Sequence, residues 1–226
     1  MKRADKIFQQ IRETLSPLEG KLFEHSFLKK VEIGKYTKKQ MALLPKEEHY
    51  IVASDVLSSR HLLRRFGESP SGAFWKSLVE NEEFAQDNII LLAEALECGQ
   101  TELEEYEPNP YCQVYPSYFA RLALQGSEAE VLTAFAANFS VWWSACRRVA
   151  IALETVYGVS KEATKFLNPL NEVPPPDAPF DDLTVDAIER GLDAGVQEKE
   201  LVRVARIIQF YELLFWNALE KSAELI

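Results

Sequence analysis

The sequence has little of what several protein classes require. It contains 9 glycines in 226 residues, too few for the tight turns that many short strands would need. Its 25 lysines and arginines are outnumbered by 35 aspartates and glutamates, and the net charge is −10. Nucleic-acid binding is disfavoured, because phosphate contacts need clustered basic side chains. These shortages favour a helical protein without a nucleic-acid partner.

Cysteine and histidine are also scarce. The 3 cysteines are an odd number, and their spacings fit neither a disulfide framework nor a zinc site, so we expect buried free thiols. The 3 histidines are scattered. The sequence also has no phosphate-binding glycine loop, no His-Glu-x-x-His helix and no Gly-x-Ser-x-Gly turn. We therefore predict no bound metal and no cofactor.

Long hydrophobic runs are missing as well. The most apolar window runs from Val131 to Cys146 and includes Asn138, which falls short of the ~20 apolar residues of a membrane span. The chain starts Met-Lys-Arg-Ala-Asp-Lys and continues as an amphipathic stretch, not as the apolar segment of a signal peptide. We expect a soluble cytoplasmic protein with no membrane partner.

What the sequence does contain is apolar residues at helical spacing. Hydrophobic residues make up 47% of the chain, enough for a large core. We predict one all-α domain over residues 1–226, a helical bundle with a buried central helix. The expected helical segments are 3–13 with 17–29, 37–66, 71–79 with 82–98, 101–105, 113–125, 127–157, 160–167, 182–194 and 196–224.

Helix ends are marked by short motifs. A Ser or Thr followed three residues later by Glu or Gln predicts a capping box at a helix start. Glycines after an apolar periodic stretch predict helix ends. The capping boxes are Thr37 with Gln40, Thr101 with Glu104 and Ser127 with Glu130, and the glycines are at 20, 67, 99, 126 and 158.

One long stretch has no helical pattern. Residues 168–181 contain five prolines, which exclude a continuous helix. We predict a surface crossover there, with a lid as the alternative.

Two acidic residues stand among apolar helical neighbours. Asp55 shares a helix face with Ile51 and Val52, so its carboxyl is expected to point to a buried pocket. A salt bridge or a helix cap is the alternative. Glu212 lies in the aromatic run Phe210 to Trp216, and pairing with Arg206 or another buried cation is the alternative there.

Other polar and aromatic positions could line the same pocket. Tyr115 and Tyr118 open a helix after a Pro-Asn-Pro turn and could stack on a flat ligand, although core packing also explains such a pair. Asn138, Ser140 and Ser144 interrupt the apolar central helix. The two serines could instead bond to the preceding turn of their own helix.

Together these positions resemble the TenA/THI-4 (thiaminase II) family of the haem-oxygenase-like superfamily, which includes PqqC and CADD-like proteins. The resemblance runs over most of the chain, and its C-terminal motif is the most specific. The motifs are His25-Ser26-Phe27, Tyr50-Ile51-Val52 followed by Asp55, Tyr115-Pro116-Ser117-Tyr118, the run Ser127 to Ser140, and Glu212 followed by Phe215-Trp216 and Ala218.

The resemblance implies a site and an activity. Asp55 and Glu212 would hold the amino and ring-nitrogen groups of an aminopyrimidine or thiamin-related compound, and Tyr115 would stack on its ring. A carboxyl that bonds the ring nitrogen can activate the ring toward nucleophilic attack. Glu212, Asp55 and Ser140 are the catalytic candidates. The resemblance also implies a homodimer or homotetramer.

The sequence departs from the family where the chemistry would occur. The nucleophilic cysteine falls on Ser140, and two supporting tyrosines fall on Ser58 and Ser144, which we keep as ligand-binding candidates. A serine without an adjacent base is a poor replacement for a thiolate. Cys146 lies six residues beyond Ser140, on another side of the helix. Cysteine-dependent thiaminase activity is therefore not expected.

The sequence also departs from the pattern of the related oxidases. Two metal-binding histidines of PqqC-like and CADD-like proteins correspond to Leu170 and Val185 here, so a six-ligand di-iron site is not expected. The interpretations left open are a divergent hydrolase, a metal-independent PqqC/CADD-like oxidase, and a binding or regulatory protein without turnover. In the hydrolase and in the binding protein the pocket ligand would be a flat nitrogen heteroaromatic, whereas a regulatory interaction protein would use its acidic surface.

Overall fold

The computed structural model describes residues 2–167 and 181–226. Within these ranges every element of regular secondary structure is a helix and there is no strand, which confirms the predicted all-α fold. The elements are α1 (Arg3–Phe23), α2 (Ser26–Glu32), α3 (Lys38–Met41), α4 (Leu43–Phe66), α5 (Gly72–Ala95), α6 (Gln100–Glu104), α7 (Val114–Gln125), α8 (Glu128–Thr155), the 3₁₀ helix η1 (Lys165–Leu167), α9 (Asp182–Asp193) and α10 (Glu198–Ala223).

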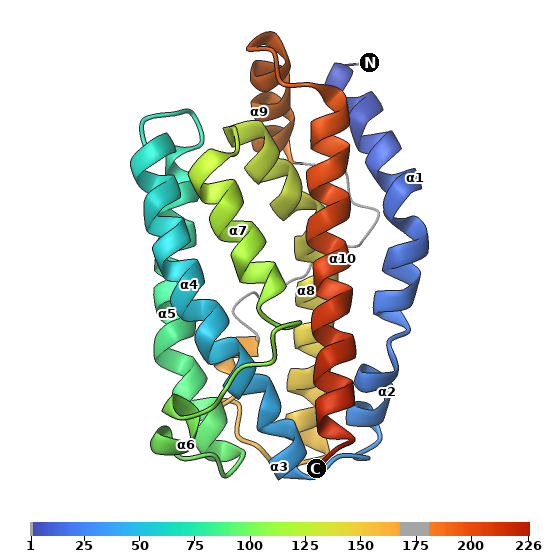
Figure 1. Ribbon diagram of the computed structural model, residues 1–226, viewed down its shortest axis with the longest axis vertical. Helices are drawn as coiled ribbons and strands as arrows, with labels where there is room; N and C mark the ends of the chain where they lie inside the picture. The colour runs from blue at the N-terminus through green and yellow to red at the C-terminus, as the bar shows by residue number, and fades with distance from the viewer. Residues whose placement is uncertain (1, 168–180) are drawn as a thin grey trace.

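The long helices run along the long axis of a bundle (Figure 1). Helix α8 is the predicted buried central helix, since α1, α2, α7, α9, α10 and η1 all contact it. Helices α4 and α5 pack against each other on the side opposite α1, and α7 crosses between α4 and α10 (Figure 1). One face of α8 therefore borders a space in the middle of the bundle that α4, α5, α7 and α10 also line.

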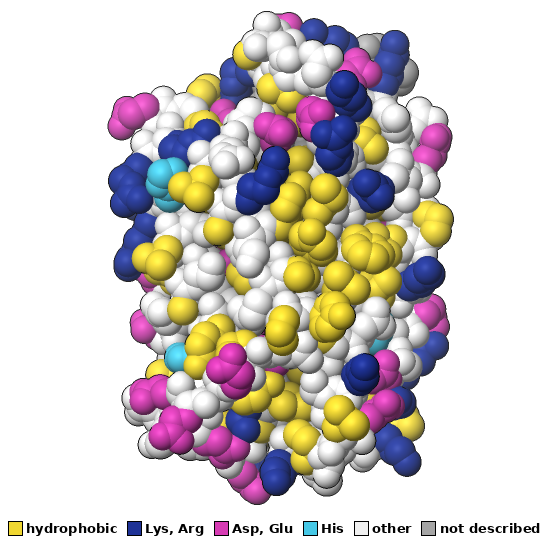
Figure 2. All heavy atoms as spheres, in the orientation of Figure 1, with side chains coloured by type: hydrophobic (Ala, Val, Ile, Leu, Met, Phe, Trp, Pro, Cys, Tyr) yellow, Lys and Arg dark blue, Asp and Glu magenta, His cyan; other side chains and the backbone are white. Residues whose placement is uncertain are grey.

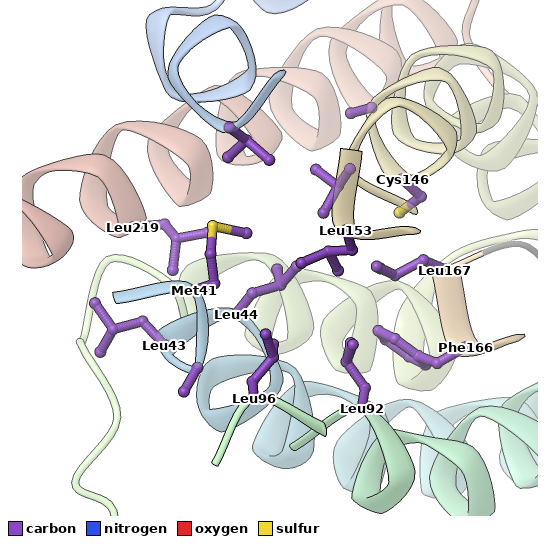
Figure 3. Close-up of a cluster of buried hydrophobic side chains, with 14 of the residues drawn as sticks. Met41, Leu43, Leu44, Leu92, Leu96, Cys146, Leu153, Phe166, Leu167 and Leu219 are labelled. Carbon is purple, nitrogen blue, oxygen red and sulfur yellow. The ribbon is translucent and has the colours of Figure 1, made fainter. Parts of the chain in front are cut away.

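A hydrophobic cluster closes the end of the bundle near α3 (Figure 3). Leu44 of α4, Leu92 of α5 and Leu153 of α8 are each 0% exposed. Phe166 and Leu167 of η1 pack beside them. Burying one such side chain contributes about 1.5–3 kcal/mol. The cluster fixes the distances between α4, α5 and α8 at this end of the bundle.

Two of the three predicted capping boxes form. The Ser127 Oγ accepts a hydrogen bond from Glu130 N at 3.2 Å, and Ser127 N donates to Glu130 Oε2 at 2.8 Å. Thr37 and Gln40 make the same reciprocal pair before α3. The Thr101 box was wrong, because α6 starts at Gln100 with Gly99 as its N-cap, which places Thr101 inside the helix.

Several predicted helix breaks were also wrong. Helix α1 continues through Pro17, because Leu15 and Leu22 extend its buried stripe across the proline. Helix α5 is continuous through residues 80–81. The predicted helix 37–66 is interrupted at Ala42, and only Lys165–Leu167 of 160–167 is helical.

The glycine signals gave mixed results. Gly67 and Gly126 are the C-caps of α4 and α7, as predicted. Gly158 follows α8 with φ 69°, a backbone conformation that favours glycine. Gly20 lies inside α1, and Gly99 begins α6 instead of ending α5.

Three further expectations concern the whole chain. Cys98, Cys112 and Cys146 are free and buried, as predicted. Among the described residues, no helix has the length and hydropathy of a membrane span. The predicted proline-rich crossover lies outside the described residues, except for Asp181, which caps α9.

Ser127, which caps α8, and Thr101, which lies inside α6, give a matched stability test. Ser127→Ala removes a formed capping box and should lower the free energy of unfolding by about 1 kcal/mol. Thr101→Ala removes the same type of side chain from a helix interior, so its effect should stay within about 0.5 kcal/mol. Urea unfolding followed by circular dichroism measures both. Equal losses in the two variants would contradict the assignment of the α8 cap.

Candidate ligand-binding site

A cavity of about 110 Å³ lies in the middle of the bundle. Its wall comes from α4, α5, α7, α8, α10 and η1. By the same measure one water needs about 10–15 Å³, so the space suits a small organic ring. The lining residues are Glu48, Ile51, Val52, Asp55, Leu78, Asn81, Glu82, Phe84, Ala85, Tyr115, Phe119, Leu122, Val131, Ala134, Phe135, Asn138, Phe139, Trp142, Trp143, Phe166, Ile208, Glu212 and Phe215.

Aromatic rings from three helices form much of the wall. Tyr115 comes from α7, Trp142 from α8 and Phe215 from α10. The Trp142 and Phe215 rings meet edge to face with centroids 5.9 Å apart. Flat faces and edges of this kind favour a planar ligand.

Glu212 reaches the cavity from α10 and is only 3% exposed. Its Oε1 accepts a hydrogen bond from the Trp216 indole at 2.6 Å, and its Oε2 accepts one from the Asn138 amide at 3.3 Å. Burial raises the pKa of Glu212 from 4.5 to about 7, and these two hydrogen bonds limit the rise. Arg206 is exposed on the outside of the helix, so the alternative of an internal ion pair is wrong.

Asp55 lies on α4 and is 6% exposed. Its Oδ1 is buried and has no hydrogen-bond partner among the described residues. Burial raises the pKa of Asp55 well above its usual value, and repulsion from Glu82 and Glu48 adds to the rise. The salt bridge and the cap considered as alternatives are both absent from the described residues, so the carboxyl is left facing the cavity.

Two further carboxyls, which the sequence analysis missed, line the same cavity. Glu48 lies on α4 and Glu82 on α5. Burial raises the pKa of Glu82 to about 7, and it raises the pKa of Glu48 well above 4.5, helped by repulsion from Glu212. Glu48 is seven residues before Asp55, about two helical turns, and that spacing was an available signal. Glu82 stands in the polar run 80–83, which reads as a solvated face.

The serine candidates lie elsewhere. Ser140 and Ser144 are partly buried on α8 but do not line the cavity. At 3.6 residues per turn they are rotated roughly 200° and 240° from Asn138, which does line it. Ser58 is buried on α4 but is also absent from the lining. The structure thus brings together Asp55, Tyr115 and Glu212 and leaves the three serines out.

Cys146 does not substitute for the missing thiol. Its side chain is 1% exposed and lies in the hydrophobic cluster of Figure 3. Burial raises the pKa of this thiol well above 9, and repulsion from Glu48 and Glu212 adds to it. A neutral, enclosed thiol is a poor nucleophile.

The all-α architecture is that of the haem-oxygenase-like fold, and several solved structures share it. A domain of unknown function with a heme oxygenase-like fold from Shewanella denitrificans OS217 has a TM-score of 0.63 and 12% identity, covering 94% of this chain and 90% of that one.

TenA homologues are among the similar structures. The TenA homologue of P. horikoshii OT3 has a TM-score of 0.67 and 17% identity, covering 94% of this chain and 97% of that one. A TenA homologue from Pseudomonas syringae pv. tomato has a TM-score of 0.72 and 15% identity, covering 94% and 92%. No protein-family model and no curated protein matches the sequence. The chain therefore has the fold of TenA homologues, and the fold implied by the sequence resemblance is confirmed.

The raised carboxyl pKa values predict how stability depends on pH. Glu212 has a folded-state pKa of about 7 against 4.5 ordinarily, so the folded state holds a proton that the unfolded state releases between these values. Stability is therefore greatest below pH 4.5 for this group and falls as the pH rises through about 7. The contribution of Glu212 to this loss of unfolding free energy should be on the order of 1–3 kcal/mol.

Glu212→Gln should flatten this decline in unfolding free energy, measured by urea titration at pH 5 and pH 8. Glu68→Gln removes one exposed carboxyl outside the cavity and controls for the change in net charge. A Glu212→Gln profile that parallels the wild-type profile would contradict the buried, protonated carboxyl.

Proposed function

We propose that the protein binds a flat, nitrogen-containing heteroaromatic, such as an aminopyrimidine or a thiamin-related compound, in the central cavity. The observation that carries the proposal is the Asp55 Oδ1, a buried acceptor without a partner among the described residues. A buried unpaired acceptor is costly, so a ligand that donates a hydrogen bond to it gains specificity as well as affinity.

The other groups suit the same ligand. An exocyclic amino group would donate to Asp55, and a ring nitrogen would face Glu212. Because the pKa of Glu212 is about 7, this carboxyl can share its proton with a weakly basic ring nitrogen at neutral pH. Tyr115 and Trp142 supply the apolar walls on which such a ring would stack.

Binding without turnover is the first form of this proposal, because neither a thiol nor a serine hydroxyl lines the described cavity. Hydrolysis is the second form, favoured by one observation. A carboxyl with a pKa near 7 can act as general acid or base on a water molecule, with Glu212 and Asp55 as the catalytic residues. No feature of the described residues favours the metal-independent oxidase over these two.

Calorimetric titration with 4-amino-5-hydroxymethyl-2-methylpyrimidine tests the site. Asp55→Asn and Glu212→Gln should each weaken binding about 10-fold or more, since a hydrogen bond to a charged group contributes about 1.5–3 kcal/mol. Ser140→Ala changes a partly buried serine outside the cavity and should bind as the wild type does. Unchanged affinity in both acid variants would show that the ligand does not occupy this cavity.

Product analysis separates the two forms. Thiamin and the aminomethyl counterpart of the same pyrimidine are incubated with the protein, and released products are measured by mass spectrometry. Saturable binding with no product supports a binding protein. Product that disappears in Glu212→Gln supports the hydrolase.

We also propose that the protein forms a homo-oligomer through the outer face of α10. Figure 2 shows hydrophobic side chains gathered at the centre of the face where α10 lies. Phe210 of α10 is 48% exposed, and Leu214, one turn further along the same helix, is partly exposed. An apolar area of this kind at the centre of a face is typical of an interaction surface, and a second copy of the chain is the occupant we propose.

Phe210→Glu should shift the protein to the monomer in light scattering coupled to size exclusion, because a carboxylate would be placed in the apolar contact. Phe84→Glu, which alters a similarly exposed phenylalanine on α5, should leave the mass unchanged. A monomeric wild-type protein would overturn the proposal.

A further inference from the structure

Three carboxyls at the α4 and α5 side of the cavity have no partner. Glu48 and Asp55 on α4 and Glu82 on α5 all line the cavity, and none has a hydrogen bond or ion pair with another described residue. Among the described lining residues none is Lys, Arg or His. Two of the three, Glu48 and Asp55, are 3% and 6% exposed.

A third helix, α8, contributes another acceptor. Asn138 of α8 is 4% exposed, and its Oδ1 is buried without a hydrogen-bond partner, while its amide nitrogen is used by Glu212. The Asp55 Oδ1 is in the same state. The cavity therefore presents several acceptors and no cationic donor, and buried acceptors of this kind are normally satisfied.

A flat heteroaromatic held by Asp55, Tyr115 and Glu212 leaves two carboxyls unexplained. Glu48 lies on α4 and Glu82 on α5, two helices that pack against each other, and both carboxyls line the cavity. Glu82 is close to the cavity rim, where its neighbours Asn81 and Phe84 are exposed. An extension from the ring toward the rim would pass these two carboxyls.

We infer that Glu48 and Glu82 form a subsite for an aliphatic ammonium group carried by the ligand beyond its ring. The inference rests on the proposed function for the position of the ring. An ammonium has three donors and one positive charge, which match two carboxyls in an apolar wall. Phe84 and Trp143 line the same cavity, and aromatic rings of this kind suit an alkyl stem and a nearby cation.

An organic ammonium fits better than a metal ion. In residues 2–167 and 181–226, no group of three His, Cys, Asp or Glu side chains has the geometry to hold one ion. The carboxyls are spread along the cavity instead, on α4, α5 and α10. Charges distributed in this way suit an elongated cation better than a point charge.

Binding of the cation should release protons. The titratable groups facing this space are Glu48 and Asp55 of α4, Glu82 of α5, Tyr115 of α7 and Glu212 of α10, with Cys146 of α8 behind them. Burial raises the pKa of every one, which favours the protonated form of the carboxyls when no cation is near. A bound ammonium replaces those protons as the source of positive charge.

A matched pair of ligands tests the subsite. Two 4-aminopyrimidines carry the same three-carbon chain at position 5, ending in an amine in one and in a hydroxyl in the other. Calorimetry of the wild-type protein should show the amine bound about 10-fold more tightly, with more protons released when the titration is repeated in a second buffer. Glu48→Gln and Glu82→Gln should each remove most of this preference while changing hydroxyl-ligand affinity less than about 2-fold.

Glu80→Gln is the control. It removes an exposed carboxyl two residues from Glu82. Glu80 pairs with Lys76, and both side chains lie on the outer surface of α5. It should keep the full preference for the amine. Circular dichroism of each variant checks that it is folded, and the hydroxyl ligand itself reports an intact ring site.

The outcomes separate this inference from the proposed function. The subsite is overturned if the wild-type protein shows no preference for the amine. It is also overturned if the preference survives in both Glu48→Gln and Glu82→Gln. Neither result contradicts the proposed ring site. Stoichiometric binding of Mn²⁺ that is lost in Glu48→Gln also overturns it. If neither pyrimidine binds, the proposed function is wrong, and 1,5-diaminopentane then tests the subsite directly. Saturable binding of 1,5-diaminopentane that is lost in both Glu48→Gln and Glu82→Gln supports the subsite. No binding of the diamine to the wild-type protein overturns it.

Discussion

Four carboxyl groups of this protein face an interior whose other walls are largely hydrocarbon. Removing a carboxylate from water costs several kcal/mol unless a proton, a donor or a cation compensates for it. Glu212 has two donors, whereas Asp55, Glu48 and Glu82 have none among the described residues. Burial raises the pKa values of these three carboxyls, and no hydrogen-bond donor limits the rise. The same shortage of donors is the reason to expect a ligand rich in N–H groups.

The bundle tolerates this arrangement because the apolar packing around the cavity is extensive. The cluster of Leu44, Leu92 and Leu153 anchors α4, α5 and α8 at one end. Trp75 and Phe119 belong to a second cluster near the other end. The cavity lies between two well-packed regions that keep its acids at fixed positions. Preorganised acceptors of this kind lower the entropic cost of binding.

The chemistry available at this site differs from what the resemblance alone implies. The cavity face of α8 presents Asn138, whereas Ser140, the position that the resemblance assigns to the nucleophile, does not line the cavity. The asparagine instead supports Glu212 with a hydrogen bond. Among the described lining residues the cavity therefore offers carboxyl and amide groups and the Tyr115 hydroxyl, but no thiol and no serine hydroxyl.

Sequence reasoning succeeded where one helix carries the whole signal. Asp55 and Glu212 were recognisable because each interrupts an apolar face of its own helix, and a local pattern of that kind reports burial directly. The capping boxes before α3 and α8 were local as well. Thr101 shows the limit of such motifs, since the same letters occur inside α6.

The sequence by itself determined the all-α fold, the central helix and the burial of the acids at positions 55 and 212, because helical periodicity is written in residues a few positions apart. Only the tertiary structure decided that Glu82 faces the same cavity as Asp55, and that Glu212 bonds to Asn138 and not to Arg206. These relations join helices distant in the chain. They depend on how α5, α8 and α10 rotate about their axes when they pack, and no local pattern encodes that rotation.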